Sequence, residues 1–305
     1  MTLHAYINKR ISSERLELLE EANKIIEEYQ REGYYITLRQ LYYQFVSRNF
    51  LENSKKSYQR LCSLMKDARM VGLVAWDAIV DRTRHLETRA RWSSPKSIID
   101  ACADDFHVHL WEGQKHRVEV WIEKDALVSV IEETCYDLDC PFLACRGYNS
   151  ASEMREAALR IIKATKYGCR YTILYAGDHD PSGSDMSNDI YKRLNQFGAR
   201  FEFRRIALNM EQVTRFNLPP NKIKDSDSRS KKYKRRFGSE CWELDALPPS
   251  ELISLIDESV RSYIDNPRVF NSRVEEVEQG RKILRSFAEN YVDLADLVQP
   301  VGTAN

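Results

Sequence analysis

Three carboxylates follow the ends of two predicted strands, in a pattern suited to binding a cation. Glu123 closes the stretch VEVWIE, and Asp178 and Asp180 come directly after YTILYAG. Residues two apart on an extended chain point to the same side, so both aspartates can face one ion. A ligand set made only of carboxylates suits magnesium better than zinc. The alternative interpretation is that the aspartates cap the following helix, since aspartate is a common N-cap.

A tyrosine suited to nucleophilic chemistry lies in the helical stretch TLRQLYYQFV. Helical spacing places Tyr42 on the buried apolar stripe and puts Arg39 and Tyr43, four residues apart, on the neighbouring face. The two side chains are then close enough to contact one phosphate. An unperturbed phenol has a pKa of about 10, so Tyr43 needs a base, a cation or a metal, and Arg39 supplies one charge. The alternative is that Tyr43 is an ordinary packed or hydrogen-bonding aromatic residue.

The first part of the chain must position Tyr43, and its spacing predicts three helices. Apolar residues recur at helical spacing over about residues 12–32, 38–48 and 54–70, with Thr37 as a candidate cap of the second helix. Three helices of this kind resemble a helix-turn-helix. The β-prone stretches LVAW and AIVDR, which follow Gly72, predict the wing of a winged-helix domain.

From His116 onward, strand and helix patterns alternate, which predicts a parallel sheet flanked by helices. The predicted strands are VEVWIE, FLACR, YTILYAGD and FEFRRIAL, and the predicted helices begin near Ala126, Ser150 and Ser184. Ligands of such sheets bind at the carboxyl ends of the strands, which is where Glu123 and the two aspartates fall.

We therefore predict an α/β protein with an N-terminal, mainly helical domain. A winged-helix domain carrying the tyrosine is expected at residues 1–92, a parallel-sheet α/β domain binding the metal at 98–248, and a C-terminal extension of two or three helices at 249–305. The polar junction RWSSPKS, residues 91–97, contains a proline that restricts its neighbour and is typical of a linker.

The carboxylate motifs resemble those of the Toprim domain, which is found in topoisomerases and some nucleases. Here they read IEKDAL and GDHDPSG, and the resemblance covers about residues 117–208. It implies that Glu123, Asp178 and Asp180 are the ligands of Mg²⁺. His179, between the two aspartates, is then expected to point away from the ion and to be structural.

A helix-turn-helix domain with R-x-x-x-Y before a Toprim domain resembles the A subunit of topoisomerase VI and the related meiotic double-strand-break transesterase. The family pattern R-D/E-I/L-Y/F-Y reads here Arg39, Gln40, Leu41, Tyr42 and Tyr43, with glutamine where an acid is usual. The segment WELDALPP matches the region after the Toprim domain. By its length the chain is most similar to the compact, stand-alone A-like proteins of phages and mobile elements.

This resemblance implies a type IIB DNA topoisomerase-like enzyme. Tyr43, assisted by Arg39, is expected to make magnesium-dependent double-strand breaks through a 5′-phosphotyrosine intermediate. It also implies a homodimer in which the tyrosine of one protomer meets the metal of the other. The sequence contains no GxxxxGK[ST] motif, so ATP-driven strand passage requires a separate subunit, of the GHKL type by resemblance.

Clusters of basic residues predict where double-stranded DNA binds. The run RSKKYKRR, residues 229–236, has six basic residues among eight and follows the sheet strands, although such runs are often only solvated loops. We expect phosphate contacts from this run, from the third helix and from the DRTR segment. The residues are Lys55, Lys56, Arg60, Arg82, Arg84, Lys231, Lys232, Lys234, Arg235 and Arg236.

Overall composition is that of an ordinary folded protein and identifies no partner. Lysine plus arginine equals aspartate plus glutamate at 46 each, so the net charge does not favour nucleic acid. The seven scattered cysteines include no CxxC pair, and no apolar stretch is long enough to span a bilayer. We expect a cytoplasmic, nucleoid-associated protein with no membrane segment.

Two other functions fit the same residues. A metal-dependent Toprim nuclease would use water as the nucleophile, with Tyr43 only positioning DNA. A DNA-binding module of a mobile element or defence system would have lost turnover and act through partners. The first predicts cleavage without a covalent adduct, and the second predicts binding without cleavage.

Overall fold

The computed structural model describes residues 3, 5–34, 36–80, 90–223 and 229–291. Residue contacts divide the chain into two compact units, Met1–Arg84 with Arg117–Tyr263, and His85–His116 with Ile264–Asn305. The first unit contains both the helix that carries Tyr43 and the residues of the predicted parallel sheet. None of the described helices is long and apolar enough to cross a lipid bilayer.

The three predicted N-terminal helices are present: α1 (Ser13–Arg31), α2 (Leu38–Ser47) and α3 (Lys55–Met70). Thr37 caps α2 in a capping box with Gln40, in which each side chain bonds the other residue's backbone N–H. Ser54 caps α3 by accepting from the backbone of Ser57. The helices begin where these caps satisfy N–H groups that have no partner inside a helix.

The predicted wing differs from the structure. LVAW, residues 73–76, contains no strand, and the turn η1 (Trp76–Ala78) leads to the short strand β2 (Ile79–Val80). β2 pairs in parallel with β1 (Ile36–Thr37), before α2, and therefore forms no hairpin with LVAW. Residues 81–82, the end of AIVDR, lie outside the described residues. The β-propensity of LVAW is overridden because Val74 and Ala75 are buried in an irregular connection.

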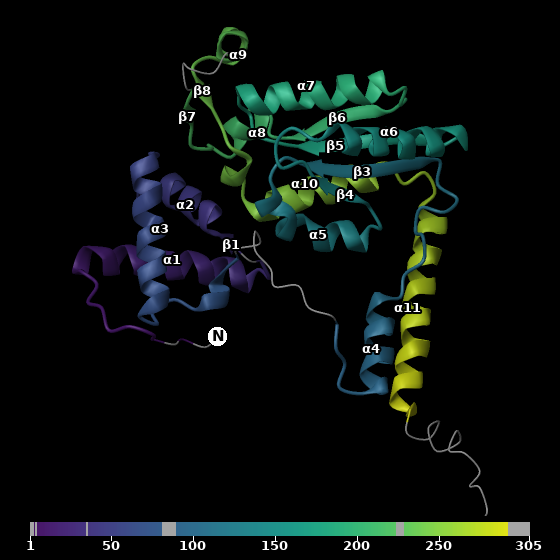
Figure 1. The fold of residues 1–305 in the computed structure, drawn as a ribbon, viewed down its shortest axis with the longest axis horizontal. Helices are drawn as coiled ribbons and strands as arrows, with labels where there is room; N and C mark the ends of the chain where they lie inside the picture. The colour runs from purple at the N-terminus through teal and green to yellow at the C-terminus, as the bar shows by residue number, and fades with distance from the viewer. Residues whose placement is uncertain (1–2, 4, 35, 81–89, 224–228, 292–305) are drawn as a thin grey trace, which may run out of the picture. The chain divides into compact units, whose positions relative to one another are not determined.

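The α/β prediction is confirmed by a four-stranded parallel sheet in the order β4-β3-β5-β6 (Figure 1). Its strands are β3 (His116–Ile122), β4 (Phe142–Ala144), β5 (Arg170–Ala176) and β6 (Glu202–Ala207). β3 and β5 are apolar along most of their length because a central parallel strand is covered on both faces. Their carboxyl ends lead directly to Glu123 and Asp178.

Helices cover both faces of the sheet (Figure 1). The core on one face unites Trp121 and Tyr175 of the sheet with apolar residues of α6 (Ala151–Lys166) and α7 (Pro181–Gln196). On the other face lie α5 (Val128–Asp137), which follows the turn η2 (Asp125–Leu127), and α10 (Pro249–Arg261). The remaining elements of the first unit are α8 (Met210–Arg215), β7 (Asn221–Lys222), α9 (Ser230–Phe237), β8 (Glu240–Cys241) and η3 (Leu244–Ala246).

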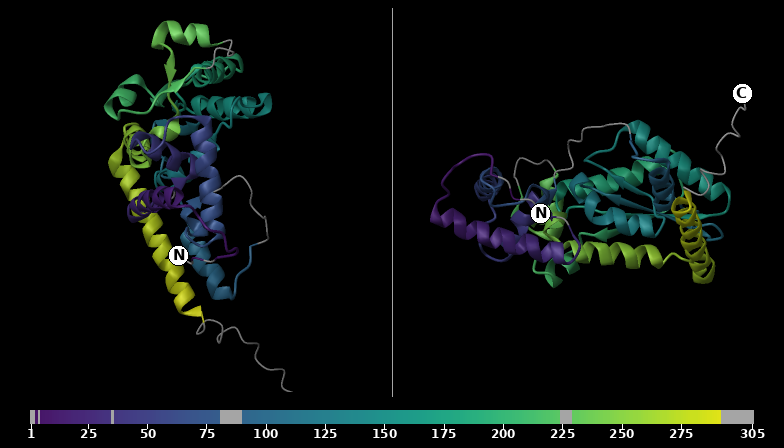
Figure 2. Two further views of the ribbon diagram at one scale, coloured as in Figure 1. Left: turned by 90° about the vertical axis from the view of Figure 1, so that its left-hand side faces the viewer. Right: turned by 90° about the horizontal axis from the view of Figure 1, so that it is seen from below.

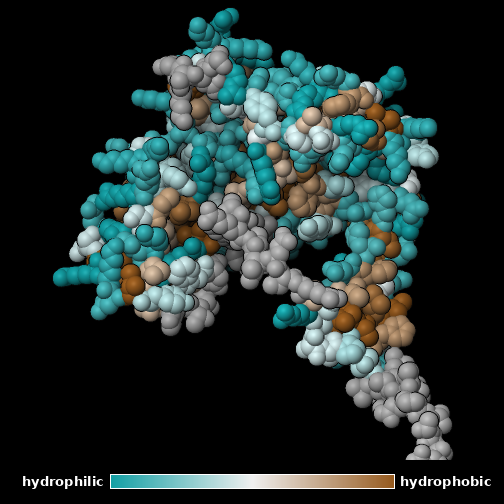
Figure 3. All heavy atoms as spheres, in the orientation of Figure 1, coloured by the Kyte–Doolittle hydropathy of each residue, from teal (hydrophilic) through white to brown (hydrophobic). Residues whose placement is uncertain are grey.

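The second unit consists of α4 (Pro95–Asp105) packed along α11 (Pro267–Glu289), as the views in Figures 1 and 2 agree. Residues 91–97 were predicted to form a linker, but the last three of them begin α4. Pro95 occupies the first turn of α4, where its missing N–H costs nothing, and Ser94 caps the helix. Apolar side chains remain exposed on this unit: Ile98, Ile283 and Phe287. Figure 3 shows brown, hydrophobic surface over α4 and α11.

Candidate active site

The carboxyl end of β5 is joined to a segment more than sixty residues further along the chain. His179 and Trp242 form an isolated antiparallel bridge, with N–H to O distances of 2.8 and 2.9 Å. The backbone N–H of Leu244 donates to Asp178 Oδ1 at 2.7 Å. These bonds fix the segment before η3 against the loop after β5, and thereby bring two further acids to Asp178.

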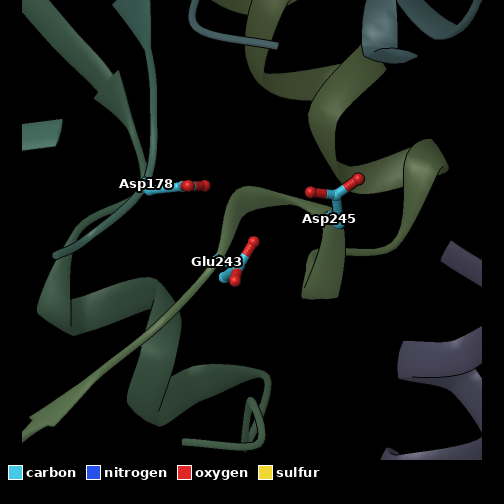
Figure 4. A group of neighbouring side chains, drawn as sticks. All are labelled: Asp178, Glu243 and Asp245. Carbon is cyan, nitrogen blue, oxygen red and sulfur yellow. The ribbon is translucent and has the colours of Figure 1, made fainter. Parts of the chain in front are cut away.

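The acids gathered there are Asp178, Glu243 and Asp245, whose carboxylates face a common space in Figure 4. One oxygen from each lies within 4.8 Å of the others, a spacing that allows one cation to be shared. Asp245 is fully buried, and its Oδ1 has no hydrogen-bond partner among the described residues. A buried carboxylate oxygen without a donor is costly unless a cation satisfies it, so the group fits a metal ion of the oxygen-ligand class.

Two basic side chains balance much of this negative charge. The ammonium of Lys124 lies 2.9 Å from Asp178 and 2.6 Å from Glu243, and it also contacts Asp245. Arg39 of α2 pairs with Glu243 and reaches Asp245 Oδ2 at 3.5 Å. Burial opposes the charge on Lys124, but the carboxylates outweigh it and hold the Lys124 pKa well above its usual value. Burial would raise the pKa of Glu243, but the charges and hydrogen bonds of Lys124 and Arg39 hold that pKa below its usual value.

Glu123 lies beside this cluster and is bonded to it through the backbone. Its Oε2 accepts the N–H of Asp178 at 2.8 Å. The approach is close because Gly177 has no side chain: a Cβ there would lie 2.5 Å from Glu123 Oε2. Burial, followed by repulsion from Asp178, raises the Glu123 pKa to about 8. Burial also raises the pKa of Asp178 to about 6, against the opposing charge of Lys124.

Asp180 caps α7, with its Oδ1 accepting the N–H of Gly183 at 2.6 Å. Burial raises the pKa of its carboxyl. The structure thus groups Asp178 with Glu243 and Asp245, whereas Glu123 and Asp180 stand next to that group in other hydrogen bonds. The assignment of Glu123, Asp178 and Asp180 as a shared ligand set stays a prediction.

His179 is packed away from the acids, as expected for a structural residue. Its ring contacts Tyr233, Phe237 and Trp242, and its Nδ1 is hydrogen-bonded to the hydroxyl of Tyr233. Burial, with the nearby charge of Arg205, lowers its pKa to about 4, so the ring is neutral at physiological pH. This packing also attaches the basic helix α9 to the loop that carries Asp178 and Asp180.

Tyr43 is buried, not placed on an open helix face. Only 3% of its surface is exposed, compared with 4% for Tyr42. The two rings are not separated as expected, because their centroids lie 5.3 Å apart and the segment containing β7 covers Tyr43. Asn221 Nδ2 donates to Tyr43 Oη at 3.0 Å, whereas the Tyr42 hydroxyl accepts from the backbone N–H of Ser54 at 2.8 Å.

The surroundings of Tyr43 act on its ionisation in opposite directions. Burial, and then the charge of Glu243, raise the Tyr43 pKa above its usual value. Arg39, Asn221 and Lys124 oppose that rise. The Arg39 guanidinium lies 5.8 Å from the centre of the Tyr43 ring while it pairs with the acids. Arg39 therefore connects the tyrosine directly to the carboxylate cluster.

A cavity of about 1040 Å³ joins these groups. Arg39 and Tyr43 of α2 line it together with Asp180 and Glu243 from the other side of the first unit. Lys55, Lys222 and Arg229 add positive charge, and the rings of Tyr42 and Tyr58 add apolar surface. Its walls therefore combine basic and aromatic side chains with carboxylates, of which Glu243 belongs to the acidic cluster.

The predicted DNA-contact residues fall into two described groups. Lys55, Lys56 and Arg60 are exposed on α3, although Arg60 pairs with Glu14 at 2.6 Å. On α9, Lys234 is half-buried and the others are exposed: Lys231, Lys232, Arg235 and Arg236. Arg82 and Arg84 lie outside the described residues.

Four residues of the site were not predicted from the sequence: Lys124, Asn221, Glu243 and Asp245. Lys124 directly follows Glu123, and both acids lie in WELDALPP, so their positions next to recognised motifs were an available signal. Asn221 had no such signal, because nothing local to it indicates contact with a tyrosine 178 residues earlier.

Comparison with known proteins leaves the geometry as the basis for any assignment. No family model matches the chain, and no curated protein or solved structure matches it. What the site can do must therefore be inferred from its own residues: a buried tyrosine, an arginine and Glu243 of the acidic cluster, which line one cavity.

Proposed function

We propose that this chain is a topoisomerase VI A-like DNA transesterase that cleaves DNA with Tyr43 in the presence of Mg²⁺. The observation that carries the proposal is that Tyr43, Arg39 and the acid Glu243 line one cavity within a single chain. A phenol, a guanidinium and a cation-binding cluster are the groups that phosphoryl transfer to a tyrosine needs.

In the proposed reaction, the phenol oxygen of Tyr43 attacks the phosphorus of a DNA phosphodiester. The new Oη–P bond forms as the bond to the 3′ oxygen breaks. The phenol proton passes to solvent, and the leaving oxygen takes a proton to become a 3′-hydroxyl. The product is a 5′-phosphotyrosine, which conserves the phosphoester bond for religation.

The residues of the chain divide the remaining tasks. Arg39 is placed to bind a phosphate oxygen beside the Tyr43 ring, because a guanidinium can form two parallel bonds to phosphate. Asp178, Glu243 and Asp245 would hold the cation, with Glu123 supporting Asp178 through its backbone. When bound, a divalent cation supplies positive charge for the oxygens that become more negative during the transfer. Lys124 must then share or yield its place among the carboxylates.

Basic residues on either side of the cavity support a DNA path across it. Lys55, Lys222 and Arg229 line the cavity itself. Helix α9 carries most of the RSKKYKRR run and is attached through Tyr233 to the loop after β5. The phosphate backbone of DNA would thus find positive charge next to the tyrosine and next to the acids.

Other features of this proposal come from the family resemblance: a winged-helix domain, a Toprim domain, a homodimer and a separate GHKL-type ATPase subunit. The resemblance implies a site shared between protomers, whereas here the tyrosine and Glu243 of one chain line the same cavity. A homodimer would still be needed to cut both strands in concert.

Trapping of covalent adducts tests the proposal directly. Purified protein is incubated with supercoiled plasmid and Mg²⁺, quenched with detergent and assayed for protein attached to 5′ ends. Tyr43→Phe is expected to abolish the adduct, because the nucleophilic oxygen is removed. Tyr42→Phe is expected to retain it, and so is Tyr167→Phe, which changes a tyrosine that is 79% exposed.

The same assay separates the alternatives. Cleavage without an adduct, unchanged by Tyr43→Phe, would establish the water-dependent nuclease. Duplex binding with no cleavage at any Mg²⁺ concentration would establish a non-catalytic DNA-binding module. Adducts at wild-type yield in Tyr43→Phe would refute the assignment of the nucleophile.

A further inference from the structure

We propose that Asn221 is the positioning residue of the proposed transesterase, holding the Tyr43 hydroxyl through its side-chain amide for attack on DNA. This inference rests on the proposed function for its catalytic consequence, but the contact itself can be tested without cleavage. Asn221 lies on β7, and its Nδ2 donates to Tyr43 Oη at 3.0 Å.

The backbone around Asn221 is fixed from three sides. β7 pairs with β8 in antiparallel register, with Asn221 opposite Cys241. The carbonyl of Pro220 accepts from Asn53 Nδ2 at 2.7 Å, and the carbonyl of Leu218 accepts from Trp242 Nε1 at 3.1 Å. A side chain on so constrained a segment presents its amide to Tyr43 in one place, which is the condition for pre-organised positioning.

The direction of the hydrogen bond matters for chemistry. An amide N–H can only donate, so it stabilises a phenol oxygen that becomes more negative as its proton leaves. Asn221 leaves the hydroxyl proton of Tyr43 free to depart. A partner that accepted this proton would instead hold the phenol neutral.

The β7–β8 strand pair also leads to one acid of the cluster, Glu243. β8 (Glu240–Cys241) continues through Trp242 into Glu243, which pairs with Arg39 and Lys124. Asn221 and Glu243 are therefore held by one pair of strands, and through them the hydroxyl of Tyr43 is held in register with the carboxylates. Displacing the β7–β8 strand pair would move both Asn221, which contacts Tyr43, and Glu243, a proposed metal ligand.

Two substitutions remove the donor in different ways. Asn221→Asp keeps the shape but presents only acceptors, and Asn221→Ala removes the group without adding charge. The matched control is Asn195→Asp, an exposed residue of α7 whose amide, among the residues that the structure describes, bonds the carbonyl of Tyr191 in its own helix. DNA dissociation constants and single-turnover adduct rates at saturating DNA are measured for all three and for the wild type.

Loss of the donor is expected to slow adduct formation about 10- to 100-fold, the usual effect of losing a hydrogen bond to a group bearing charge. The dissociation constant for DNA should stay within about twofold for Asn221→Ala, and Asn195→Asp should match the wild type. Rates within twofold of the wild type in both Asn221 variants would overturn the proposal. So would a weaker affinity with a normal rate at saturation, which would make Asn221 a DNA-binding residue.

A spectroscopic measurement tests the contact whether or not the protein cleaves DNA. 3-Fluorotyrosine incorporated at position 43 gives one ¹⁹F resonance that reports on the environment of the hydroxyl. Asn221→Asp and Asn221→Ala should shift this resonance, and Asn195→Asp should leave it in place. An unchanged resonance in both Asn221 variants overturns the contact. A shifted resonance in a protein that forms no adduct would uphold the contact while refuting the transesterase function.

Discussion

Two glutamates with similar local contacts serve different ends. Glu119 lies on β3 and Glu123 directly follows that strand, and each contacts a tyrosine of β5. Tyr171 donates to Glu119, and Tyr175 Oη lies 3.4 Å from Glu123 Oε2. Both residues are buried: 3% of the surface of Glu119 and 8% of the surface of Glu123 are exposed.

What surrounds each pair is different. Glu119 accepts from Trp121 Nε1 at 2.8 Å and is paired with Arg160 at 3.1 Å, so its charge is matched by donors on every side. Glu123 has the backbone N–H of Asp178 and faces the negative charge of Asp178 itself.

The difference shows which buried acid is structural and which is available for chemistry. The carboxylate of Glu119 is fully hydrogen-bonded and has no capacity left for a ligand. Glu123 instead lies beside the acidic cluster, in which Asp245 Oδ1 has no hydrogen-bond partner among the described residues. Figure 4 shows the carboxylates of the cluster, Asp178, Glu243 and Asp245, facing a common space. Three substitutions test this contrast, from the largest expected loss of stability to the smallest.

Replacing Lys124 should have the largest effect, because it removes the cation that the acidic cluster surrounds. We expect Lys124→Met to lower the free energy of unfolding by about 3–5 kcal/mol without metal, since uncompensated carboxylates stay buried. Mg²⁺ should restore more stability to this variant than to the wild type. Urea denaturation with and without Mg²⁺ measures both. An equal effect of Mg²⁺ on the stability of the two proteins would contradict a metal site at the acidic cluster. The control is Lys163→Met, which changes an exposed lysine of α6.

In the middle of β3, Glu119→Gln should destabilise the fold but leave cleavage unchanged. The neutral amide loses the charge that pairs with Arg160 and turns an NH₂ group toward existing donors, at a cost of about 1.5–3 kcal/mol. Cleavage per folded molecule should be unchanged. Denaturation curves and adduct yield decide the matter, with exposed Glu156→Gln for comparison. A loss of adducts in well-folded Glu119→Gln would remove the distinction drawn between the two glutamates.

The smallest change in stability is expected for Glu123→Gln, and it should be accompanied by a loss of activity. Its amide oxygen can still accept from Asp178, and the repulsion between two carboxylates disappears, so stability should change by less than about 1 kcal/mol. Adduct formation should fall about 10- to 100-fold, as when the ionisable carboxyl beside a metal ligand is replaced by a neutral amide. A stability loss as large as that of Glu119→Gln, with normal activity, would reverse the roles.

Much of the scaffold could be predicted because its signals are local. Thr37 and Ser54 cap helices at the positions that their side chains favour, and the apolar β3 and β5 are recognisable from consecutive residues. The wing and the linker were predicted less well. In LVAW, tertiary burial outweighed β-propensity, and in α4 a proline signalled the start of a helix.

The sequence by itself placed Glu123 and Asp178 after the ends of two strands and put Arg39 and Tyr43 one helical turn apart. Only the tertiary structure decided that Glu243 and Asp245 complete an acidic cluster, and that Asn221 meets Tyr43. The physical reason is the distance along the chain between the residues that interact. Periodicity and capping depend on neighbours a few residues away, whereas a bridge such as His179 to Trp242 forms only when the folded core brings distant segments together.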